Sequence, residues 1–403
     1  MRKLDSEFMK ALPVIQKIQE AGYEAYFVGG SVRDRILKKP IADVDIATSA
    51  FPMEVKEIFP RTVDVGIEHG TVMVLFEGEG YEVTTFRTES TYQDYRRPDA
   101  VTFVRSLEED LKRRDFTVNA LAMNSEGELI DYFGGLKDIE KKVIKAVGSA
   151  SERFHEDALR MMRGVRFVSQ LNFSMETKTE SAIKEHHALL EKIAVERIQV
   201  EFVKLLLGQG RQIGLRKMIE TELYQFCPGL ASKKAGLTSF ATLETHLGTA
   251  TSAWTLLTYF IELPVAEIEL FLRNWKCSKK EIKHVIKERI AFDQRLDSFW
   301  TKEGLYQAGL EIALEVEALI EGFQQESHLK TLQELYEDLP IKDRQEMQVS
   351  GSDLITALKR PAGPWLGELL ANIEQQLLIG AIPNQKQAIL EWALVADKGE
   401  DAL

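Results

Sequence analysis

The chain carries Val28-Gly29-Gly30-Ser31-Val32-Arg33-Asp34 and, after an interval of eight residues, Asp43-Val44-Asp45. The first motif is typical of a short apolar strand, a tight glycine turn and then a helix. Ser31 is placed to cap this helix, with Asp34 as the acidic partner of a capping box. Glycine lets backbone N–H groups approach a phosphate, and the start of a helix favours anions. The motif therefore predicts a phosphate-binding turn, with Arg33 able to grip a phosphate oxygen.

The second motif lies in a segment, Ala42 to Ala47, in which acidic and aliphatic residues alternate. Alternation with a period of two predicts a strand, and side chains two residues apart project from the same face of a strand. Two neighbouring carboxylates are costly unless a cation lies between them, and hard divalent ions prefer such oxygen ligands. Alone, Asp43 and Asp45 would more often be two solvated acids, so their interpretation depends on the glycine turn upstream.

The first 140 or so residues combine strand and helix signals, whereas from about Ser149 strand-like alternation nearly vanishes. In the first part we expect a helix at Leu12 to Ala21 and strands at Tyr26 to Val28 and Val101 to Val104. We also expect a hairpin, with strands at Thr71 to Phe76 and Tyr81 to Phe86 and with Gly78 and Gly80 in the connection. Later segments such as Ile312 to Phe323 have helical apolar spacing. The sequence therefore predicts an α+β protein, with a small mixed sheet followed by helical domains.

Composition indicates a cytoplasmic protein, because the chain of 403 residues has only two cysteines, no basic-then-apolar leader and no apolar run of membrane-spanning length. Cys227 and Cys277 lie far apart, so neither a disulfide scaffold nor a zinc site is expected. The net charge of −12 counts against a nucleic-acid partner. A phosphate track needs only a local basic stripe, however, and Lys112 to Arg114 and Arg160 to Arg166 supply such stripes.

The stretch from His155 to Phe167 combines an apolar stripe with charged residues at helical spacing. In a continuous helix, Asp157 and Arg160 are neighbours at i and i+3, and Arg163 and Arg166 continue their row. Taken alone, this arrangement is more often an ion pair within a helix that packs on a core.

The glycine turn and the two aspartates, at this spacing, closely resemble the signature of the polymerase-beta-like nucleotidyltransferase superfamily. They are most similar to the class II tRNA nucleotidyltransferases and the bacterial poly(A) polymerases. The segments that resemble later motifs of this family are Arg113 to Ala120, Asp131 to Asp138, His155 to Phe167 and Glu196 to Glu201. The last of these we interpret as structural. The resemblance implies a catalytic head (1–148), a helical neck that recognises the base (149–207), a helical body (208–295) and a helical tail that binds tRNA (296–403).

The resemblance also implies an activity: addition of CCA to the 3′ end of tRNA from CTP and ATP, without a nucleic-acid template and with release of pyrophosphate. The resemblance implies that Asp43 and Asp45 hold two Mg²⁺ ions and that Asp157 and Arg160 choose the base. We expect Gly30, Arg33 and Arg114 to orient the nucleotide, and Arg163 and Arg166 to bind phosphate or brace the pair. Glu82, on a neighbouring expected strand, is a candidate third carboxylate.

Hydrogen-bonding rules support the expected choice of base. A carboxylate only accepts and a guanidinium only donates. Cytosine and adenine each present an amino donor beside a ring acceptor, which suits an aspartate beside an arginine. Uracil and guanine invert that order, and each misplaced buried group costs on the order of 1–3 kcal/mol. The pair formed by Asp157 and Arg160 is thus expected to reject UTP and GTP.

Alternatives within the enzyme class are a poly(A) polymerase and an enzyme that adds only CC. The arginine-rich segment Thr91 to Pro98 resembles the loop that family members need for addition of A, which argues against the second. A helical RNA-binding protein with an inactive head and an antibiotic nucleotidyltransferase are further alternatives. We expect the helical remainder to bind the acceptor arm of tRNA through phosphates and shape, and the C-terminal helices could also pair two copies of the chain as a homodimer.

Overall fold

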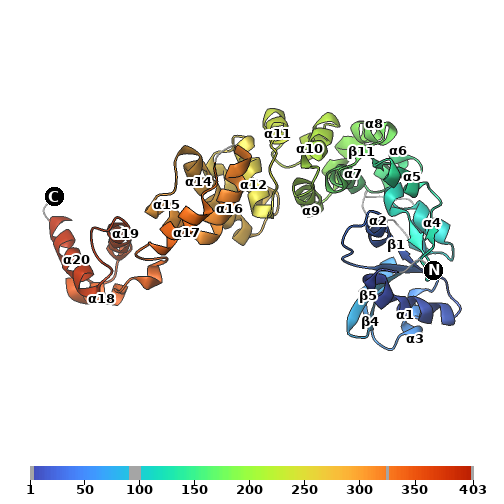
Figure 1. The fold of residues 1–403 in the computed structure, drawn as a ribbon, viewed down its shortest axis with the longest axis horizontal. Helices are drawn as coiled ribbons and strands as arrows, with labels where there is room; N and C mark the ends of the chain where they lie inside the picture. Colours follow the sequence, from blue (N-terminus) through green and yellow to red (C-terminus); the bar gives the residue numbers. More distant parts are fainter. Residues whose placement is uncertain (1–3, 90–100, 324–325, 401–403) are drawn as a thin grey trace. The chain divides into compact units, whose positions relative to one another are not determined.

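The computed structural model describes residues 4–89, 101–323 and 326–400 (Figure 1). The chain forms two compact units, one of Met1–Thr242 with Asn274–Lys276 and one of Leu243–Arg273 with Cys277–Leu403. The first unit contains the sheet and the second is helical, which confirms the predicted α+β class. The finer division into four domains stays a prediction.

A seven-stranded mixed sheet organises the first unit, in the order β3-β4-β5-β2-β1-β8-β9. Its strands are β1 (Ala25–Val28), β2 (Asp45–Thr48), β3 (Thr62–Gly66), β4 (Thr71–Phe76), β5 (Glu79–Thr85), β8 (Ala122–Met123) and β9 (Leu129–Ile130). Strands β2 and β5 run parallel, and the other neighbours run antiparallel. The parallel pair brings two segments that lie far apart in the chain side by side, and the site described below is built on it.

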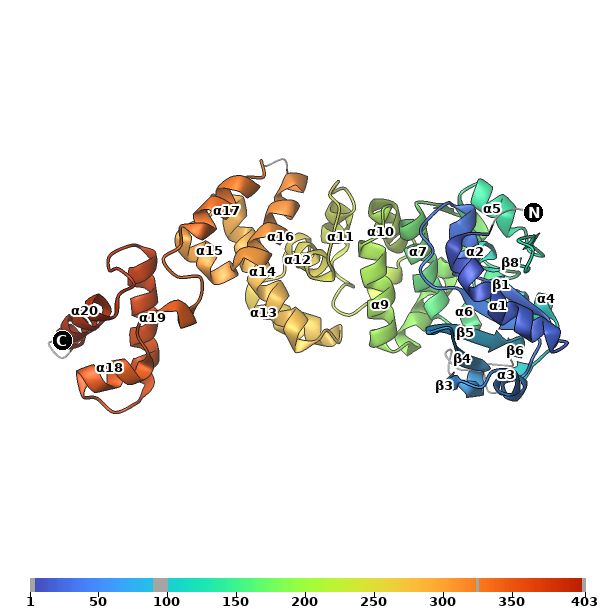
Figure 2. The ribbon, with the colours of Figure 1, turned by 60° about the horizontal axis from the view of Figure 1, so that its bottom comes forward.

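Two helices cover one part of this sheet, α1 (Ser6–Glu20) and α3 (Pro52–Ile58). Helix α1 lies beside β1 (Figure 2) and buries its apolar side there. The rings of Phe8 and Phe27 meet edge to face, with their centroids 4.8 Å apart. The helix begins at Ser6 rather than at the predicted Leu12, because Phe8 and Ala11 belong to the same buried stripe.

The hairpin of β4 and β5 confirms the prediction made from the sequence. Its connection consists of Glu77 and Gly78, both with positive φ (51° and 87°). Positive φ at both central residues is the two-residue turn whose twist matches that of the flanking strands. Gly80 lies inside β5 and not in the connection, so the strand starts two residues before the predicted Tyr81.

The predicted strand from Ala42 to Ala47 is wrong at its start, because β2 begins only at Asp45. The antiparallel pairing of β1 with β2 ends where Val28 meets Asp45. Directly after Val28 the chain turns away at Gly29, whose φ is 73°. Asp43 therefore has no opposite residue on β1 and precedes the strand.

Further strands are short: β6 (Arg87–Glu89) pairs with β7 (Val101–Phe103), and β10 (Val143–Ile144) pairs with β11 (Ser174–Met175). Besides α1 and α3, the first unit contains the helices α2 (Gly30–Ile36), α4 (Leu107–Lys112), α5 (Gly135–Glu140), α6 (Ala150–Glu156), α7 (Leu159–Leu171), α8 (Thr177–His186), α9 (Val195–Leu206), α10 (Arg211–Glu220) and α11 (Lys234–Phe240). Helix α7 packs against α9 and α10, and Gly214 of α10 allows this contact, because a Cβ there would lie 2.7 Å from Cβ of Ser169.

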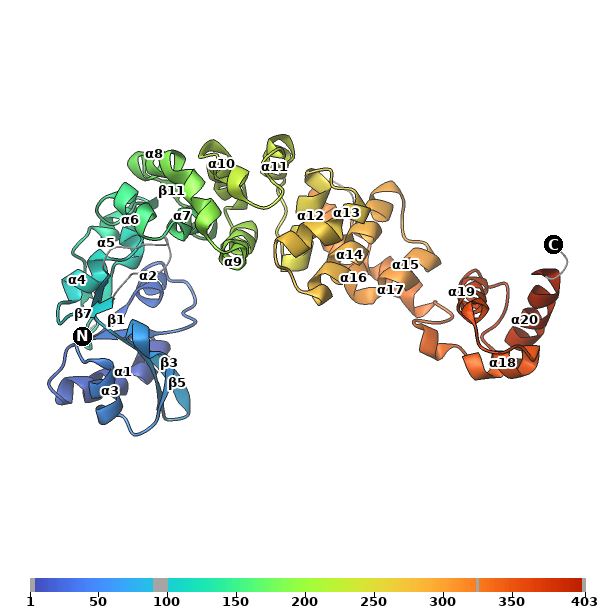
Figure 3. The ribbon, with the colours of Figure 1, turned by 180° about the vertical axis from the view of Figure 1, so that it is seen from behind.

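The second unit contains α12 (Ala250–Phe260), α13 (Val265–Asn274), α14 (Lys279–Asp297), α15 (Lys302–Ala308), α16 (Leu310–Ile320), α17 (Leu329–Glu337), α18 (Gly351–Leu358), α19 (Pro364–Leu378) and α20 (Lys386–Glu400). Helix α14 lies between α12 and α16 and packs on both (Figure 3). The predicted apolar stripe on α16 is buried from Ile312 to Ile320. Among the helices of the described residues, none has the length and apolar character that a membrane crossing requires.

Candidate active site

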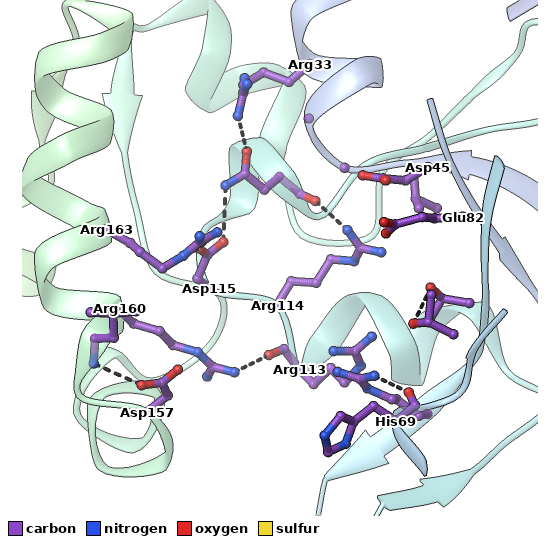
Figure 4. Close-up of a pocket in the computed structure, with 18 of the residues that line it drawn as sticks. Arg33, Asp45, His69, Glu82, Arg113, Arg114, Asp115, Asp157, Arg160 and Arg163 are labelled. Carbon is purple, nitrogen blue, oxygen red and sulfur yellow. Dashed lines mark hydrogen bonds and ion pairs between the residues drawn. The ribbon is translucent and has the colours of Figure 1, made fainter. Parts of the chain in front are cut away.

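A cavity of about 840 Å³ in the first unit collects most of the residues that the sequence singled out (Figure 4). One side is formed by β2, β4 and β5, and the other by α2, α7 and the Arg113–Arg114 segment that follows α4. The predicted site residues that line it are Gly30, Arg33, Asp45, Glu82, Arg114, Asp157, Arg160, Arg163 and Arg166. Asp43 is absent from this lining.

The glycine turn has the predicted strand–turn–helix form. Gly29 has φ 73° and ψ −130°, and α2 starts directly after it at Gly30. A Cβ on Gly29 would come within 2.8 Å of Nη1 of Arg114, so the absence of a side chain lets that guanidinium lie against the turn. The turn therefore keeps both its backbone and an arginine at the cavity wall.

The predicted capping box of Ser31 and Asp34 is wrong. The helix starts two residues earlier than a Ser31 cap requires, so Ser31 lies inside α2, where its hydroxyl donates to the carbonyl of Val28 at 3.2 Å. Asp34 instead accepts from the Nε and Nη2 of Arg33, both at 2.9 Å. The Nη1 of Arg33 donates to Oδ1 of Asn119, so the guanidinium is fixed in one orientation at the cavity wall.

Carboxylates gather where β2 and β5 run side by side. The pairing of Ile46 with Val83 sets Asp45 beside Glu82, and both line the cavity. Burial raises the pKa of Asp45, the guanidinium of Arg114 lowers it, and the charges of Glu82 and Asp43 raise it further. Asp43 lines an adjoining hollow that Asp45 and Glu82 also reach. The prediction that two aspartates project from one strand is thus corrected to Asp45 and Glu82 on two parallel strands, with Asp43 just ahead of the first.

Asp157 and Arg160 both line the cavity, but they do not lie on one continuous helix as predicted. Helix α6 ends at Glu156, Asp157 is extended (φ −139°, ψ 104°), and α7 begins at Leu159. The carboxylate of Asp157 accepts from the N–H of Leu159 at 3.0 Å, which satisfies a donor at the new helix start. This local hydrogen bond stabilises the break between the two helices.

Each member of the expected base-reading pair has another partner. Asp157 pairs with Arg197 of α9 at 2.8 Å. Arg160 pairs with Glu156 at 2.6 Å and donates to the carbonyl of Arg113 at 2.9 Å. The two side chains lie near each other at one end of the cavity, held separately by flanking groups (Figure 4).

Arg163 and Arg166 are engaged with buried carboxylates beside the cavity. Arg163 donates to Asp115 at 2.6 Å, and Arg166 pairs with Glu201 at 2.5 Å. Burial alone would raise the pKa of Asp115, but Arg163 and a hydrogen bond from Asn119 hold it at about 2. Burial lowers the pKa of Arg166 to about 10 although Glu201 opposes this, so Arg166 stays charged at neutral pH.

Several residues that line the cavity were not predicted from the sequence to belong to the site. Asp115 and Asn119 lie within the Arg113–Ala120 motif and link Arg163 to Arg33 through side-chain hydrogen bonds. Arg197 lies in a segment that we interpreted as structural, and its contact with Asp157 spans 40 positions in the chain. The motif containing Asp115 offered a signal for that residue, whereas nothing in the sequence linked position 197 to position 157. The Thr91–Pro98 segment lies outside the described residues.

Three family models match successive parts of the chain. A family model described as the poly(A) polymerase head domain matches residues 25–145, one for an RNA- and SrmB-binding site of polymerase A matches residues 172–234, and one for tRNA nucleotidyltransferase domain 2 matches residues 245–393.

Curated relatives and a solved structure are similar over nearly their full lengths. The CCA-adding enzyme of Enterococcus faecalis is 55% identical over 99% of both chains, and that of Bacillus cytotoxicus is 50% identical over 96% of this chain and 98% of its own. The crystal structure of the Bacillus stearothermophilus CCA-adding enzyme in complex with CTP superposes with a TM-score of 0.92, at 43% identity, over 99% of this chain and 100% of the other.

Proposed function

This chain belongs to the CCA-adding enzymes, and from that premise we propose that the cavity of its first unit is where nucleotides are joined to tRNA. The enzyme adds CCA to the 3′ end of tRNA from CTP and ATP without a nucleic-acid template. One observation carries the assignment to this cavity: the carboxylates of Asp45 and Glu82 share it with Arg114 and with both Asp157 and Arg160. Metal-binding, phosphate-binding and base-reading groups thus lie within reach of one nucleotide.

The carboxylates at the edge of β2 and β5 suit a divalent cation, which we propose is Mg²⁺ held by Asp45, Asp43 and Glu82. Burial, and after it the charges of Glu82 and Asp43, raises the pKa of Asp45, and a cation among the three carboxylates would relieve their repulsion. Oxygen donors of this kind match the preference of Mg²⁺. When bound, Mg²⁺ lowers the pKa of the attacking 3′-hydroxyl and stabilises charge on the leaving pyrophosphate.

The triphosphate is held by the glycine turn and by two arginines. Gly30 supplies an N–H at the start of α2, where anions are favoured. Arg33 and Arg114 both donate to Asn119, through its side chain and its carbonyl. Because Asn119 fixes both guanidiniums, they meet the phosphates without first losing conformational freedom.

Base choice rests on Asp157 as the acceptor and Arg160 as the donor. Both are oriented before a base arrives, Asp157 by Arg197 and Arg160 by Glu156. We assign Arg163 to bracing and not to phosphate binding, because its strongest contact is the buried carboxylate of Asp115. The same applies to Arg166, whose carboxylate partner Glu201 is buried as well.

We further propose that the helical remainder of the chain binds the acceptor arm of tRNA, that the protein acts in the cytoplasm, and that two copies can pair through the C-terminal helices. In α20, Leu394 and Val395 expose 39% and 73% of their surface, which leaves apolar area for such a contact.

The proposed function is tested with purified Asp45→Asn protein, tRNA lacking its CCA end, Mg²⁺, and CTP and ATP. We expect incorporation to fall at least a thousandfold, since a carboxylate at the reacting phosphate becomes a neutral amide. The matched control is Asp64→Asn, an exposed aspartate of β3 paired with Lys56 outside the cavity. Activity of Asp45→Asn equal to that of the control would remove Asp45 from the reaction. Products three nucleotides longer, and not long tails, separate this activity from poly(A) synthesis.

A further inference from the structure

The cavity extends beyond the carboxylates, along the strands β4 and β5. Thr71, Thr84 and His69 line it together with Asp45 and Glu82. In Figure 4 His69 lies on the same side as Glu82, across the cavity from Asp157 and Arg160. The groups assigned to the incoming nucleotide therefore leave one region of the lining without a role.

This region has a defined position relative to the carboxylates. Glu82 and Thr84 are two residues apart on β5, so their side chains project from one face about 7 Å apart. Thr71 stands opposite Thr84 in the β4–β5 register, and their hydroxyl oxygens lie 3.0 Å apart. The hydroxyl pair thus lies one strand repeat, about 7 Å, from Glu82. This distance is close to the length of one nucleotide along an RNA strand.

The polar groups of the region suit a single phosphodiester. The bond between the two threonine hydroxyls uses one hydroxyl hydrogen, which leaves the other able to donate to a ligand. Arg87 of β6 lines the same region and donates to the carbonyl of His69. Among the described lining residues, the other arginines come from α2, the Arg113–Arg114 segment, α7 and α9, so the concentrated positive charge that a triphosphate needs lies elsewhere.

The direction of the reaction places the RNA end in this region. In phosphoryl transfer the attacking and leaving oxygens lie on opposite sides of the reacting phosphorus. If the arginines of α2 and of the Arg113–Arg114 segment hold the leaving pyrophosphate, the attacking hydroxyl must approach from the other side of Asp45 and Glu82. In the sheet order β4-β5-β2-β1, the β4–β5 hairpin that carries Thr71 and Thr84 lies on the opposite side of β2 and Asp45 from β1 and the helix α2 that follows it, and both threonines line the cavity.

We propose that Thr71 and Thr84, with His69 and Arg87 beside them, bind the phosphodiester of the last nucleotide of the growing tRNA and so position its 3′-hydroxyl. This proposal rests on the function proposed above. It assigns the sheet side of the cavity to RNA and the helix side to the nucleoside triphosphate. The two threonines are positioning residues for the acceptor and take no proton in the reaction.

The test uses Thr84→Val in the full-length protein, a change that removes the hydroxyl, keeps the shape and suits a strand. We expect the KM for tRNA to rise roughly tenfold, the loss of one hydrogen bond to a charged group, with the KM for CTP unchanged. Thr62→Val on β3 of the same sheet, outside the cavity lining, is the matched control. Thr71→Val should reproduce the effect if Thr84→Val fails to fold.

A second measurement identifies the contacted group. Replacing the last phosphodiester of the tRNA by a methylphosphonate should weaken wild-type binding, and should weaken binding to Thr84→Val by a smaller factor, because the contact with Thr84 is already lost in that variant. Additive losses would overturn the proposal. So would an unchanged KM for tRNA, or a rise in the KM for pyrophosphate in the reverse reaction, which would assign the hydroxyls to the leaving group. If the threonine variants leave the KM for tRNA unchanged while Asp45→Asn is inactive, only the acceptor site is refuted. If Asp45→Asn stays active, the proposed function of the cavity is refuted.

Discussion

A buried carboxyl in the second unit makes its stability depend on pH in a way that can be calculated. Glu288 of α14 is fully buried and accepts hydrogen bonds from the hydroxyls of Ser252 at 2.7 Å and Thr255 at 2.9 Å. Burial raises the pKa of Glu288 from 4.5 to about 7, against the effect of the two hydroxyls, and Glu315 contributes to the rise while His284 opposes it.

The sign follows from the direction of this shift. Because the pKa of Glu288 is higher in the folded than in the unfolded chain, the folded state binds more protons between pH 4.5 and about 7. The free energy of unfolding therefore falls as pH rises through this window and is constant above it. The difference of about 2.5 pH units, at about 1.4 kcal/mol each, corresponds to about 3 kcal/mol. Glu288→Gln removes the titration, and its amide can still accept from one hydroxyl and donate to the other.

We expect Glu288→Gln to match the wild type at pH 4, below the unfolded pKa of 4.5, and to be more stable by about 3 kcal/mol at pH 8. The assay is hydrogen exchange of the α12 and α14 amides, with variant and wild type compared at the same pH, because the chain has two units and global unfolding is not one transition. Exchange at pH 8 should slow on the order of a hundredfold. Glu311→Gln, at an exposed glutamate of α16, is the control. Equal effects of Glu288→Gln at both pH values would refute the reasoning.

Gly29→Ala should raise the KM for CTP roughly tenfold, because the new Cβ would lie only 2.8 Å from Nη1 of Arg114 and would displace that guanidinium. The control is Gly22→Ala, which also has positive φ but open space around it, and which should lower only the melting temperature. Equal effects of the two variants on KM would refute this role of Gly29. Arg160→Ala should reduce discrimination of CTP against UTP by about ten- to a hundredfold in kcat/KM, and an unchanged ratio would count against base reading by Arg160. Asp115→Asn should be less stable than the wild type at pH 7 but about equal to it at pH 2. The depressed pKa of Asp115 stabilises the folded state above pH 3.8, and this stability is lost as pH falls through about 2. Thermal unfolding at both pH values measures the difference, and a difference that persists at pH 2 would contradict this reasoning.

The strands and turns of the head were predictable because local chemistry determines them. Two consecutive residues of positive φ, Glu77 and Gly78, determine the hairpin, and alternating burial on β4 and β5 follows the sequence pattern. The start of β2 was not predictable in the same way. It depends on where β1 ends, and a strand cannot continue in a ladder beyond its partner. Asp43 and Asp45 look equivalent in the sequence for this reason and differ in the structure.

The break between α6 and α7 shows a second limit of the sequence. No proline or glycine marks Asp157, and Ala158, Leu159 and the methionines that follow favour a helix. The carboxylate of Asp157 stabilises the break locally by accepting from Leu159, and Arg197 stabilises it from 40 positions away. Helical spacing therefore predicted two residues that line the same cavity, while giving the wrong geometry for their pairing.

This broken geometry has a consequence for how a base would be chosen. Had Asp157 and Arg160 paired with each other in one helix, a base would first have to separate an ion pair. Instead Arg197 neutralises Asp157 and Glu156 neutralises Arg160, so each side chain keeps its charged partner and can present a further acceptor or donor to the cavity. A carboxylate has about four lone-pair sites and a guanidinium has five N–H groups, so one ion pair does not exhaust either. Base choice by these two residues thus requires no broken salt bridge, and the cost of a wrong base is set by its own misplaced donors and acceptors.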